Sequence, residues 1–201
     1  LALAKDQGAE LVVVGPEAPL VAGVADALKA AGIPCFGPTS DAARLEASKS
    51  FAKHVMAEAG VATARSFPCR NMSEVDAALE ELGAPHVVKD DALAAGKGVV
   101  VTHNLQEARA HAKACLERED GAVVIEDYLD GPEVSLFCLC DGTSVIPLVP
   151  AQDFKRAGDA NSGPNTGGMG AYSPLPWLDE GVVEEVVRSV AQPTVDAMAK
   201  R

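Results

Sequence analysis

The segment "VVKDDALAAGKGVVV" (87–101) has the residue types that a phosphate-binding loop needs. Lys89 and Lys97 offer cationic donors to a polyphosphate. Gly96 and Gly98 leave backbone N–H groups uncovered, so that an anion can approach them. Because apolar β-branched runs flank the loop, it connects two strands. The alternative interpretation is a tight turn with two solvated lysines.

Two common nucleotide motifs do not fit this segment. A G-x-x-x-x-G-K-[S/T] loop needs glycine at the position of Asp91 and a hydroxyl residue at the position of Gly98. A G-x-G-x-x-G fingerprint needs glycine at the position of Val101. The loop therefore needs another explanation.

Three further segments contain residues that could bind a charged ligand. "LEASKSFAK" (45–53) places Lys49 and Lys53 one helical turn apart, although a solvated helix face would look the same. "VIEDYLDGPEVS" (124–135) is a strand, a connector and then Glu133, which alone would pass for a surface strand acid. Residues 151–174 combine acids, bases and glycines, and the alternative there is a disordered linker.

Composition excludes several classes of partner. The 201 residues carry 29 acids against 17 bases, a net charge of −12, which argues against nucleic acid or an anionic membrane as a main partner. A small anionic ligand needs only a few local donors. No apolar run reaches the roughly 18 residues of a membrane helix, and no basic-then-apolar pattern supports an expectation of export. Cys138 and Cys140 are predicted to be buried thiols, in keeping with a reducing cytoplasm.

Strands and helices alternate over residues 1–39, which predicts a parallel α/β layer with strands near 12–14 and 33–37 and a helix over about 21–31. In such sheets ligands lie beyond the carboxyl ends of strands, where "GPEAPL" (15–20) and "GPTS" (37–40) stand. Both ends of the chain lie in helix-like runs, so we expect an internal fragment of a longer protein.

The remaining elements follow from caps and periodicity. Thr39 or Ser40 can cap a helix that runs toward Gly60, and a C-terminal helix is expected to bend near Pro193. We expect residues 150–177 to form a long functional loop. The other expected elements are helices from Ser73 with Asp76 to Leu82 and from Asn104 with Glu107 to Arg118, strands at 86–89, 98–102 and 122–127, and a hairpin of 133–140 with 144–149.

The order of these motifs resembles the phosphoribosylamine–glycine ligase family, also called glycinamide ribonucleotide synthetase, of purine biosynthesis. The motifs "GPEAPLVAG", "FGPT", "LEASKSFAK", "LAAGKGVVV", "IEDYLDGPEVS", "AQDFKR" and "GPNTGGMGAYSP" carry the resemblance along essentially the whole chain. It implies an ATP-grasp fold, in which two α+β subdomains clamp ATP, preceded by part of a Rossmann-like parallel α/β domain. The expected boundaries are 1–46 for the N-terminal part and 47–201 for a truncated ATP-grasp domain, with a lid subdomain at about 61–123.

The resemblance also implies an ATP site. Lys49 and Lys89 would lie against the phosphates, and Glu133 would accept from the ribose hydroxyls. A mobile flap would close over the phosphates, and a connector would meet adenine through its backbone. The flap residues are Leu93, Ala94, Ala95, Gly96, Lys97 and Gly98, and the connector residues are Glu126, Asp127, Tyr128 and Leu129.

A second implied site binds the phosphoribosylamine. Asp153 would hold ribose hydroxyls or the amine, Lys155 and Arg156 would offset phosphate charge, and Glu17 would line the cleft. Backbone and side-chain donors would come from one further stretch. Its residues are Asn165, Thr166, Gly167, Gly168, Met169 and Gly170.

The reaction implied is ATP-dependent ligation through glycyl phosphate, which needs no protein nucleophile. The Mg²⁺ or Mn²⁺ ligands of the family lie C-terminal to this segment, so no metal ligand is predicted here, and we expect the 201-residue chain to be inactive alone. The four histidines are interpreted as incidental, and the expected protein is a cytoplasmic monomer. Two alternatives stay open: another ATP-grasp carboxylate–amine ligase, and a non-catalytic nucleotide-binding relative.

The chain departs from the family's usual "KADGLAAGKG" at two positions. Asp90 replaces a small residue and is interpreted as surface variation. Ala92 replaces a glycine, and alanine would be strained if this position needs a positive φ. Replacing Ala92 by glycine is then expected to improve ATP binding or turnover.

Overall fold

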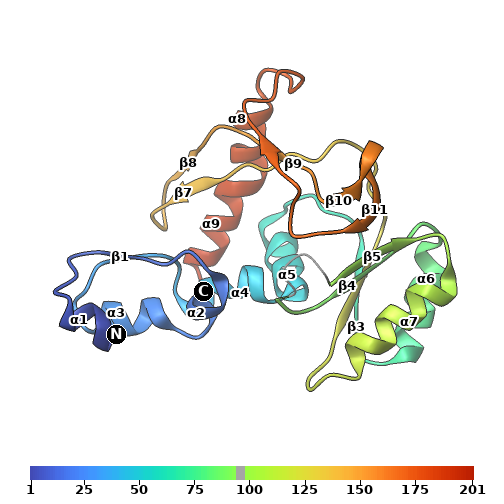
Figure 1. Cartoon of the computed structure of the whole chain (residues 1–201), viewed down its shortest axis with the longest axis horizontal. Coiled ribbons are helices and arrows are strands. Elements are labelled where there is room, and N and C mark those ends of the chain that lie inside the picture. Colours follow the sequence, from blue (N-terminus) through green and yellow to red (C-terminus); the bar gives the residue numbers. More distant parts are fainter. Residues whose placement is uncertain (94–97) are drawn as a thin grey trace. The chain divides into compact units, whose positions relative to one another are not determined.

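The computed structural model describes residues 1–93 and 98–201 (Figure 1). The chain forms two compact units, Leu1–Ala52 and Lys53–Arg201, and each is described by itself. Across the described residues, no helix combines the length and the apolar character that crossing a membrane requires.

The first unit is a small parallel α/β layer. Val12 pairs with Cys35 and Val13 with Phe36 in a parallel arrangement, as the alternation of strands and helices predicted. Leu20, from a helix that follows the first strand, is buried in a small apolar core. The elements of this unit are α1 (Ala2–Asp6), β1 (Val12–Val13), α2 (Glu17–Val21), α3 (Val24–Ala30), β2 (Cys35–Phe36) and α4 (Ser40–Ala47).

Two predicted helices are interrupted. The helix expected over 21–31 breaks at Gly23, whose φ of 86° is left-handed and cannot continue a helix. The helix expected to run from Thr39 toward Gly60 breaks at Ser48, which is extended. The Ser48 hydroxyl accepts from the N–H of Phe51 at 3.1 Å, so it caps a new helix, α5 (Lys49–Ala59).

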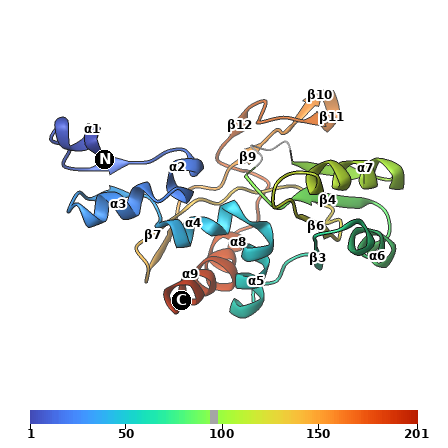
Figure 2. The same ribbon diagram turned by 90° about the horizontal axis from the view of Figure 1, so that it is seen from below.

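A four-stranded antiparallel sheet is the best-packed part of the second unit. Its strand order is β3-β6-β4-β5, and two helices pack against one face, α6 beside β3 and β6, and α7 along β4 and β5 (Figure 2). Val88, Val123 and Ile125 point to that face and are fully buried. The elements are β3 (Ser66–Cys69), α6 (Met72–Leu82), β4 (His86–Asp90), β5 (Val99–Thr102), α7 (Leu105–Leu116) and β6 (Val123–Glu126).

The two helices of this sheet begin at asparagine caps. Asn104 was expected, and its side chain accepts from the N–H of Glu107 at 3.3 Å. For α6, the prediction that Ser73 caps the helix is wrong. Asn71 accepts from the N–H of Glu74 at 3.0 Å, so the helix begins at Met72. Asparagine and serine are comparable caps, and the reciprocal bond from the Asn71 amide to the Glu74 carboxylate at 2.7 Å favours the earlier start.

The predicted hairpin after the sheet is present but shorter. β7 (Cys138–Cys140) pairs with β8 (Val145–Pro147), with Leu139 opposite Ile146. The prediction that Cys138 and Cys140 are buried is wrong, because Cys138 is half-buried and Cys140 is exposed. A two-stranded hairpin leaves side chains exposed that a larger sheet would cover.

Residues 150–172 form a nested ribbon instead of the irregular loop that was predicted. β9 (Gln152–Asp153) pairs with β12 (Ala171–Tyr172), and β10 (Arg156–Gly158) pairs with β11 (Ser162–Asn165), all antiparallel. A short 3₁₀ turn, η1 (Asp159–Asn161), forms the tip. The glycine-rich composition hid these strands, because glycine weakens a strand signal.

The C-terminal helix is irregular close to Pro193, where the sequence predicted a bend. α8 (Val182–Val186) continues into a π-helical stretch, η2 (Val187–Ala191), and then into α9 (Gln192–Ala199). Pro193 lacks an N–H and its ring would collide with the carbonyl four residues earlier in a regular helix. The wider π-helical turn ends at Ala191, two residues before that proline.

Candidate functional site

Lys89 and Glu126 meet on the sheet face opposite the two helices. They lie on the neighbouring strands β4 and β6, and the Lys89 ammonium donates to Glu126 Oε2 at 2.7 Å. The Glu126 side chain is only 6% exposed and that of Lys89 is 30% exposed. The sequence proposed both residues for one ligand, and the structure brings them together.

A second lysine, Lys53 of α5, contacts the same carboxylate. Its ammonium lies 3.5 Å from Glu126 Oε1, and it donates to the Thr63 hydroxyl at 2.7 Å and to the carbonyl of Ala64 at 3.0 Å. Burial lowers the pKa of Lys53, the Glu126 carboxylate opposes that shift, and the nearby Lys89 adds to it. Sequence analysis noted the helical spacing of Lys53 but did not propose it for the site.

The chain segments that enter β3 and leave β6 are clamped together. The Arg65 guanidinium donates to both carboxylate oxygens of Asp127, at 2.8 and 3.1 Å, and the Asp127 N–H donates to the Arg65 carbonyl. Hydrogen bonds from Arg65 hold the pKa of Asp127 below its usual range. The N–H of Asp127 is therefore engaged within the protein.

The side chains of Tyr128 and Leu129, which follow Asp127, are exposed, so they are not part of a packed core.

The base of the glycine-rich loop closes the β4–β5 hairpin. The N–H of Asp90 donates to the Gly98 carbonyl at 2.8 Å, and His111 Nε2 lies 3.2 Å from the same oxygen. This confirms that the loop joins two paired strands. Leu93 is exposed at its start. The predicted flap residues Ala94, Ala95, Gly96 and Lys97 lie outside the described residues.

At both departures from the family pattern, the structure differs from what the sequence suggested. The surface interpretation of Asp90 is wrong, because its side chain is 3% exposed and pairs with Arg118. A buried carboxylate needs such a partner. The strain expected at Ala92 is also absent. Among described non-glycine residues only Asp120 and Ala160 have a positive φ, so the motive for replacing Ala92 by glycine is gone.

A second cluster of charges joins three more of the predicted site residues. The Lys155 ammonium lies 3.0 Å from a carboxylate oxygen of Glu133 and 3.0 Å from one of Asp153. Burial lowers the pKa of Lys155, but the hydrogen bonds to Asp153 and Glu133 outweigh it and the pKa is raised. The predicted ribose ligand Glu133 thus lies beside the residues predicted to bind the second substrate.

The stretch from Asn165 to Gly170 is folded back on the strand that carries Lys155. The N–H and hydroxyl of Thr166 both donate to the Lys155 carbonyl, at 2.7 and 2.9 Å, and the N–H of Met169 donates to the Phe154 carbonyl at 2.7 Å. Arg156 lies opposite Asn165 and donates to a backbone carbonyl across the ribbon.

The glycines of this stretch face open space. A Cβ at Gly167, Gly168 or Gly170 would meet no atom within 4 Å, and the last two have positive φ values of 122° and 149°. The protein itself therefore does not crowd these positions. The space beside the three Cα atoms is open, although the Gly168 N–H donates to the Thr166 hydroxyl and the Gly170 carbonyl accepts from the Phe154 N–H.

Two predicted residues lie in the first unit. Glu17 is exposed in the first turn of α2, and Lys49 is half-buried at the start of α5. Each is described within that unit alone.

The whole chain matches one family of proteins. Residues 47–201 match the domain described as phosphoribosylglycinamide synthetase, ATP-grasp (A) domain, and residues 1–46 match the N domain of the same synthetase. The chain belongs to the phosphoribosylglycinamide synthetase family. The phosphoribosylamine–glycine ligase of Streptomyces coelicolor is 69% identical, over all of this chain and 47% of that protein. That of Mycobacterium tuberculosis strain H37Rv is 57% identical over all of this chain and 49% of the relative. The chain spans about half the length of these curated relatives.

Solved structures agree on the family fold. Phosphoribosylamine–glycine ligase from Thermotoga maritima superposes with a TM-score of 0.82 at 28% identity, over 98% of this chain and 50% of that one. D-alanine–D-alanine ligase from Bacillus anthracis, complexed with ATP, gives 0.69 at 20% identity, over 98% and 62% of the two chains, and supports the fold alone. The predicted ATP-grasp fold is confirmed.

The described residues were also compared with the side-chain groupings that bind metal ions. Over residues 1–93 and 98–201, no three His, Cys, Asp or Glu side chains group in a way that could hold a metal ion. No step of the chemistry below is therefore assigned to metal ligands of this chain.

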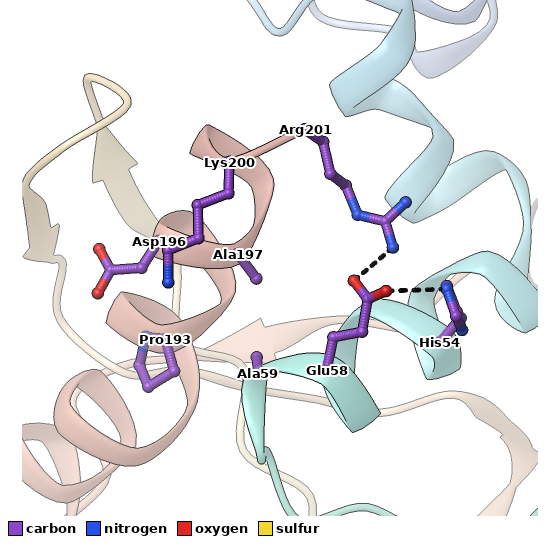
Figure 3. Close-up of a pocket in the computed structure, with 8 residues that line it drawn as sticks. All are labelled: His54, Glu58, Ala59, Pro193, Asp196, Ala197, Lys200 and Arg201. Carbon is purple, nitrogen blue, oxygen red and sulfur yellow. Dashed lines mark hydrogen bonds and ion pairs between the residues drawn. The ribbon is translucent and has the colours of Figure 1, made fainter.

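A pocket of about 570 Å³ lies between α5 and α9, away from the predicted residues (Figure 3). The Glu58 carboxylate at its wall faces His54 Nε2 at 3.1 Å and accepts from Arg201 at 2.5 Å. Lys200 and Asp196 add one charge of each sign. Because its charges compensate one another, the pocket does not select an anion or a cation.

Proposed function

We propose that this chain is part of an ATP-dependent carbon–nitrogen ligase that joins glycine to 5-phosphoribosylamine and forms glycinamide ribonucleotide, ADP and phosphate. The observation that carries the proposal is the match of the entire chain to the two synthetase domains. In this proposal the protein is a cytoplasmic monomer, and its other partners are small molecules only.

The proposed chemistry activates a poor electrophile. The glycine carboxylate attacks the γ-phosphorus of ATP and displaces ADP, which gives glycyl phosphate. The 1-amine of phosphoribosylamine then attacks the glycyl carbonyl carbon, loses a proton and expels phosphate. The protein supplies position, charge stabilisation and exclusion of water, so no protein nucleophile takes part.

We assign the ATP phosphates to Lys89 together with Lys49 and the loop 93–98, and adenine to the connector 126–129. Lys89 suits this role because it is half-buried and its ammonium group can donate a hydrogen bond to a phosphate oxygen. Mg²⁺ accompanies ATP in the proposed reaction, and its ligands are not assigned to this chain.

We assign phosphoribosylamine to the ribbon 152–172 and to Glu17. Asp153 and Lys155 offer one acceptor and one donor there, and the open glycine backbone of 167–170 leaves space beside them. Glu133, which shares Lys155 with Asp153, connects this site with the proposed ribose contact of ATP.

An assay of ADP formation by a full-length protein that contains this chain tests the proposal. We expect ADP to form only when glycine and phosphoribosylamine are both present, and Lys89→Met to reduce kcat/KM by about 100-fold or more, as loss of a transition-state charge contact does. Lys113→Met, an exposed lysine of α7, is the matched control and should leave the rate unchanged. ADP formation with another amine would favour a different ATP-grasp ligase, and nucleotide binding without turnover would favour a non-catalytic relative.

A further inference from the structure

The Lys53 side chain is mostly buried and hydrogen-bonded to the protein, unlike a solvated surface lysine. Its side chain is 14% exposed. An ammonium group has three protons to donate, and three acceptors surround this one. They are the Thr63 hydroxyl at 2.7 Å, the Ala64 carbonyl at 3.0 Å and Glu126 Oε1 at 3.5 Å.

The Glu126 carboxylate is shared between two lysines. One oxygen faces Lys89 and the other faces Lys53, and the carboxylate is nearly fully buried. Two cations beside one buried anion leave a surplus positive charge. A nucleotide phosphate would neutralise that surplus, because an opposite charge nearby favours the charged forms of both lysines.

A phosphate that approaches Lys89 meets an ammonium that is already paired with Glu126. The bond from Lys89 to Glu126 is short, at 2.7 Å, and a phosphate oxygen has to compete with it. A buried carboxylate that loses its only cation is strongly destabilised. Lys53 is the second cation on the other oxygen, and its bonds to Thr63 and Ala64 hold it there independently of Lys89.

We propose that Lys53 is a positioning residue that keeps Glu126 paired and so releases Lys89 to bind the phosphates of a nucleoside di- or triphosphate. This inference rests on the proposed function, because it takes Lys89 as a phosphate ligand. Lys53 itself touches no substrate in this role.

The test measures ADP binding by calorimetry in the full-length protein that contains this chain. We expect Lys53→Met to weaken ADP binding by about 10-fold or more, since Glu126 then retains Lys89 as its single partner. Lys53→Arg keeps the charge and should stay within about 3-fold of the unsubstituted protein. Lys53→Gln keeps a hydrogen-bond donor without the charge and should behave like the methionine variant. Lys113→Met is the matched control.

A double substitution separates positioning from general loss of structure. Glu126→Gln removes the charge that retains Lys89, so adding Lys53→Met to it should change ADP affinity by less than about 3-fold, a clear departure from additivity. A purely structural role for Lys53 would weaken binding equally in both backgrounds, and that result would overturn the inference. So would ADP affinities of the methionine and glutamine variants equal to that of the unsubstituted protein.

Failure of the proposed function gives a different result. If the unsubstituted protein binds neither ADP nor ATP, the assignment of Lys89 to a nucleotide fails, and this inference fails with it. Normal ADP binding that is insensitive to Lys53 overturns the inference alone. Should Lys53→Met lower the thermal unfolding midpoint too far for titration, Lys53→Gln and the Glu126→Gln pair carry the test.

Discussion

Two regions of the second unit differ in how they bury apolar side chains. The sheet and helices over 66–126 enclose a contiguous core in which Val88, Val123 and Ile125 are fully buried. Among the described residues of 127–201, Leu175 is the one large apolar side chain that is buried. There Phe137 is 68% exposed and Ile146 is 61% exposed.

The two regions show that regular strand pairing can occur with or without a packed core beneath it. Both regions have antiparallel hairpins with regular registers, β4–β5 and β7–β8. The first hairpin is covered by α7, which packs along both of its strands, whereas in the second hairpin β8 lies beside the π-helical stretch η2. Because a two-stranded hairpin that buries little apolar surface is marginal in water, we expect the β7–β8 pairing to be less protected than the β4–β5 pairing.

The largest expected effect is on amide hydrogen exchange. We expect the central amides of β4 and β6 to exchange at least about 1,000-fold more slowly than those of β7 and β8, because core strands open only near global unfolding. Exchange followed by mass spectrometry or NMR on the 201-residue chain measures this. Equal protection in the two hairpins would break the comparison, and β5 gives an internal reference for a sheet edge.

Two matched substitutions test the same difference through the free energy of unfolding. Ile125→Ala removes a fully buried side chain and should lower the free energy of unfolding by about 2–5 kcal/mol. Ile146→Ala removes one that is 61% exposed and should cost less than about 0.5 kcal/mol. Urea unfolding followed by circular dichroism measures both. A similar loss in the two variants would mean that Ile146 is packed in solution.

The smallest effect concerns the turn of the exposed hairpin. Asp141 accepts from the N–H of Ser144 and from the N–H and hydroxyl of Thr143, and these hydrogen bonds lower its pKa to about 2. Since the folded pKa is below the ordinary value of 3.8, the contribution to stability is full above 3.8 and is lost as pH falls through about 2.

Carbon-13 NMR titration of the Asp141 carboxyl measures that pKa. Thr143→Ala removes the hydroxyl donor and should move the pKa toward 3.8, whereas the two backbone donors remain. An ordinary pKa in the unsubstituted chain would show that the turn is not formed in solution.

The sequence alone determined the family, the ATP-grasp fold and most elements of the 66–126 region. These depend on local signals, such as the Asn104 cap and short β-branched runs, and on motifs read in order along the chain. Local signals were less reliable where a neighbouring residue offered a comparable cap, as Asn71 did for Ser73. They also failed in the ribbon 152–172, where glycine hides the strands.

Only the tertiary structure decided which charges meet. Lys53 and Glu126 are 73 positions apart, and no local spacing indicates that they share a buried site with Lys89. The buried Asp90 pairs with Arg118, which follows the C-terminal end of α7, 28 positions away in the sequence. Local sequence fixes backbone conformation within a few residues, but the pairing of buried charges depends on long-range packing, because packing is what removes them from water.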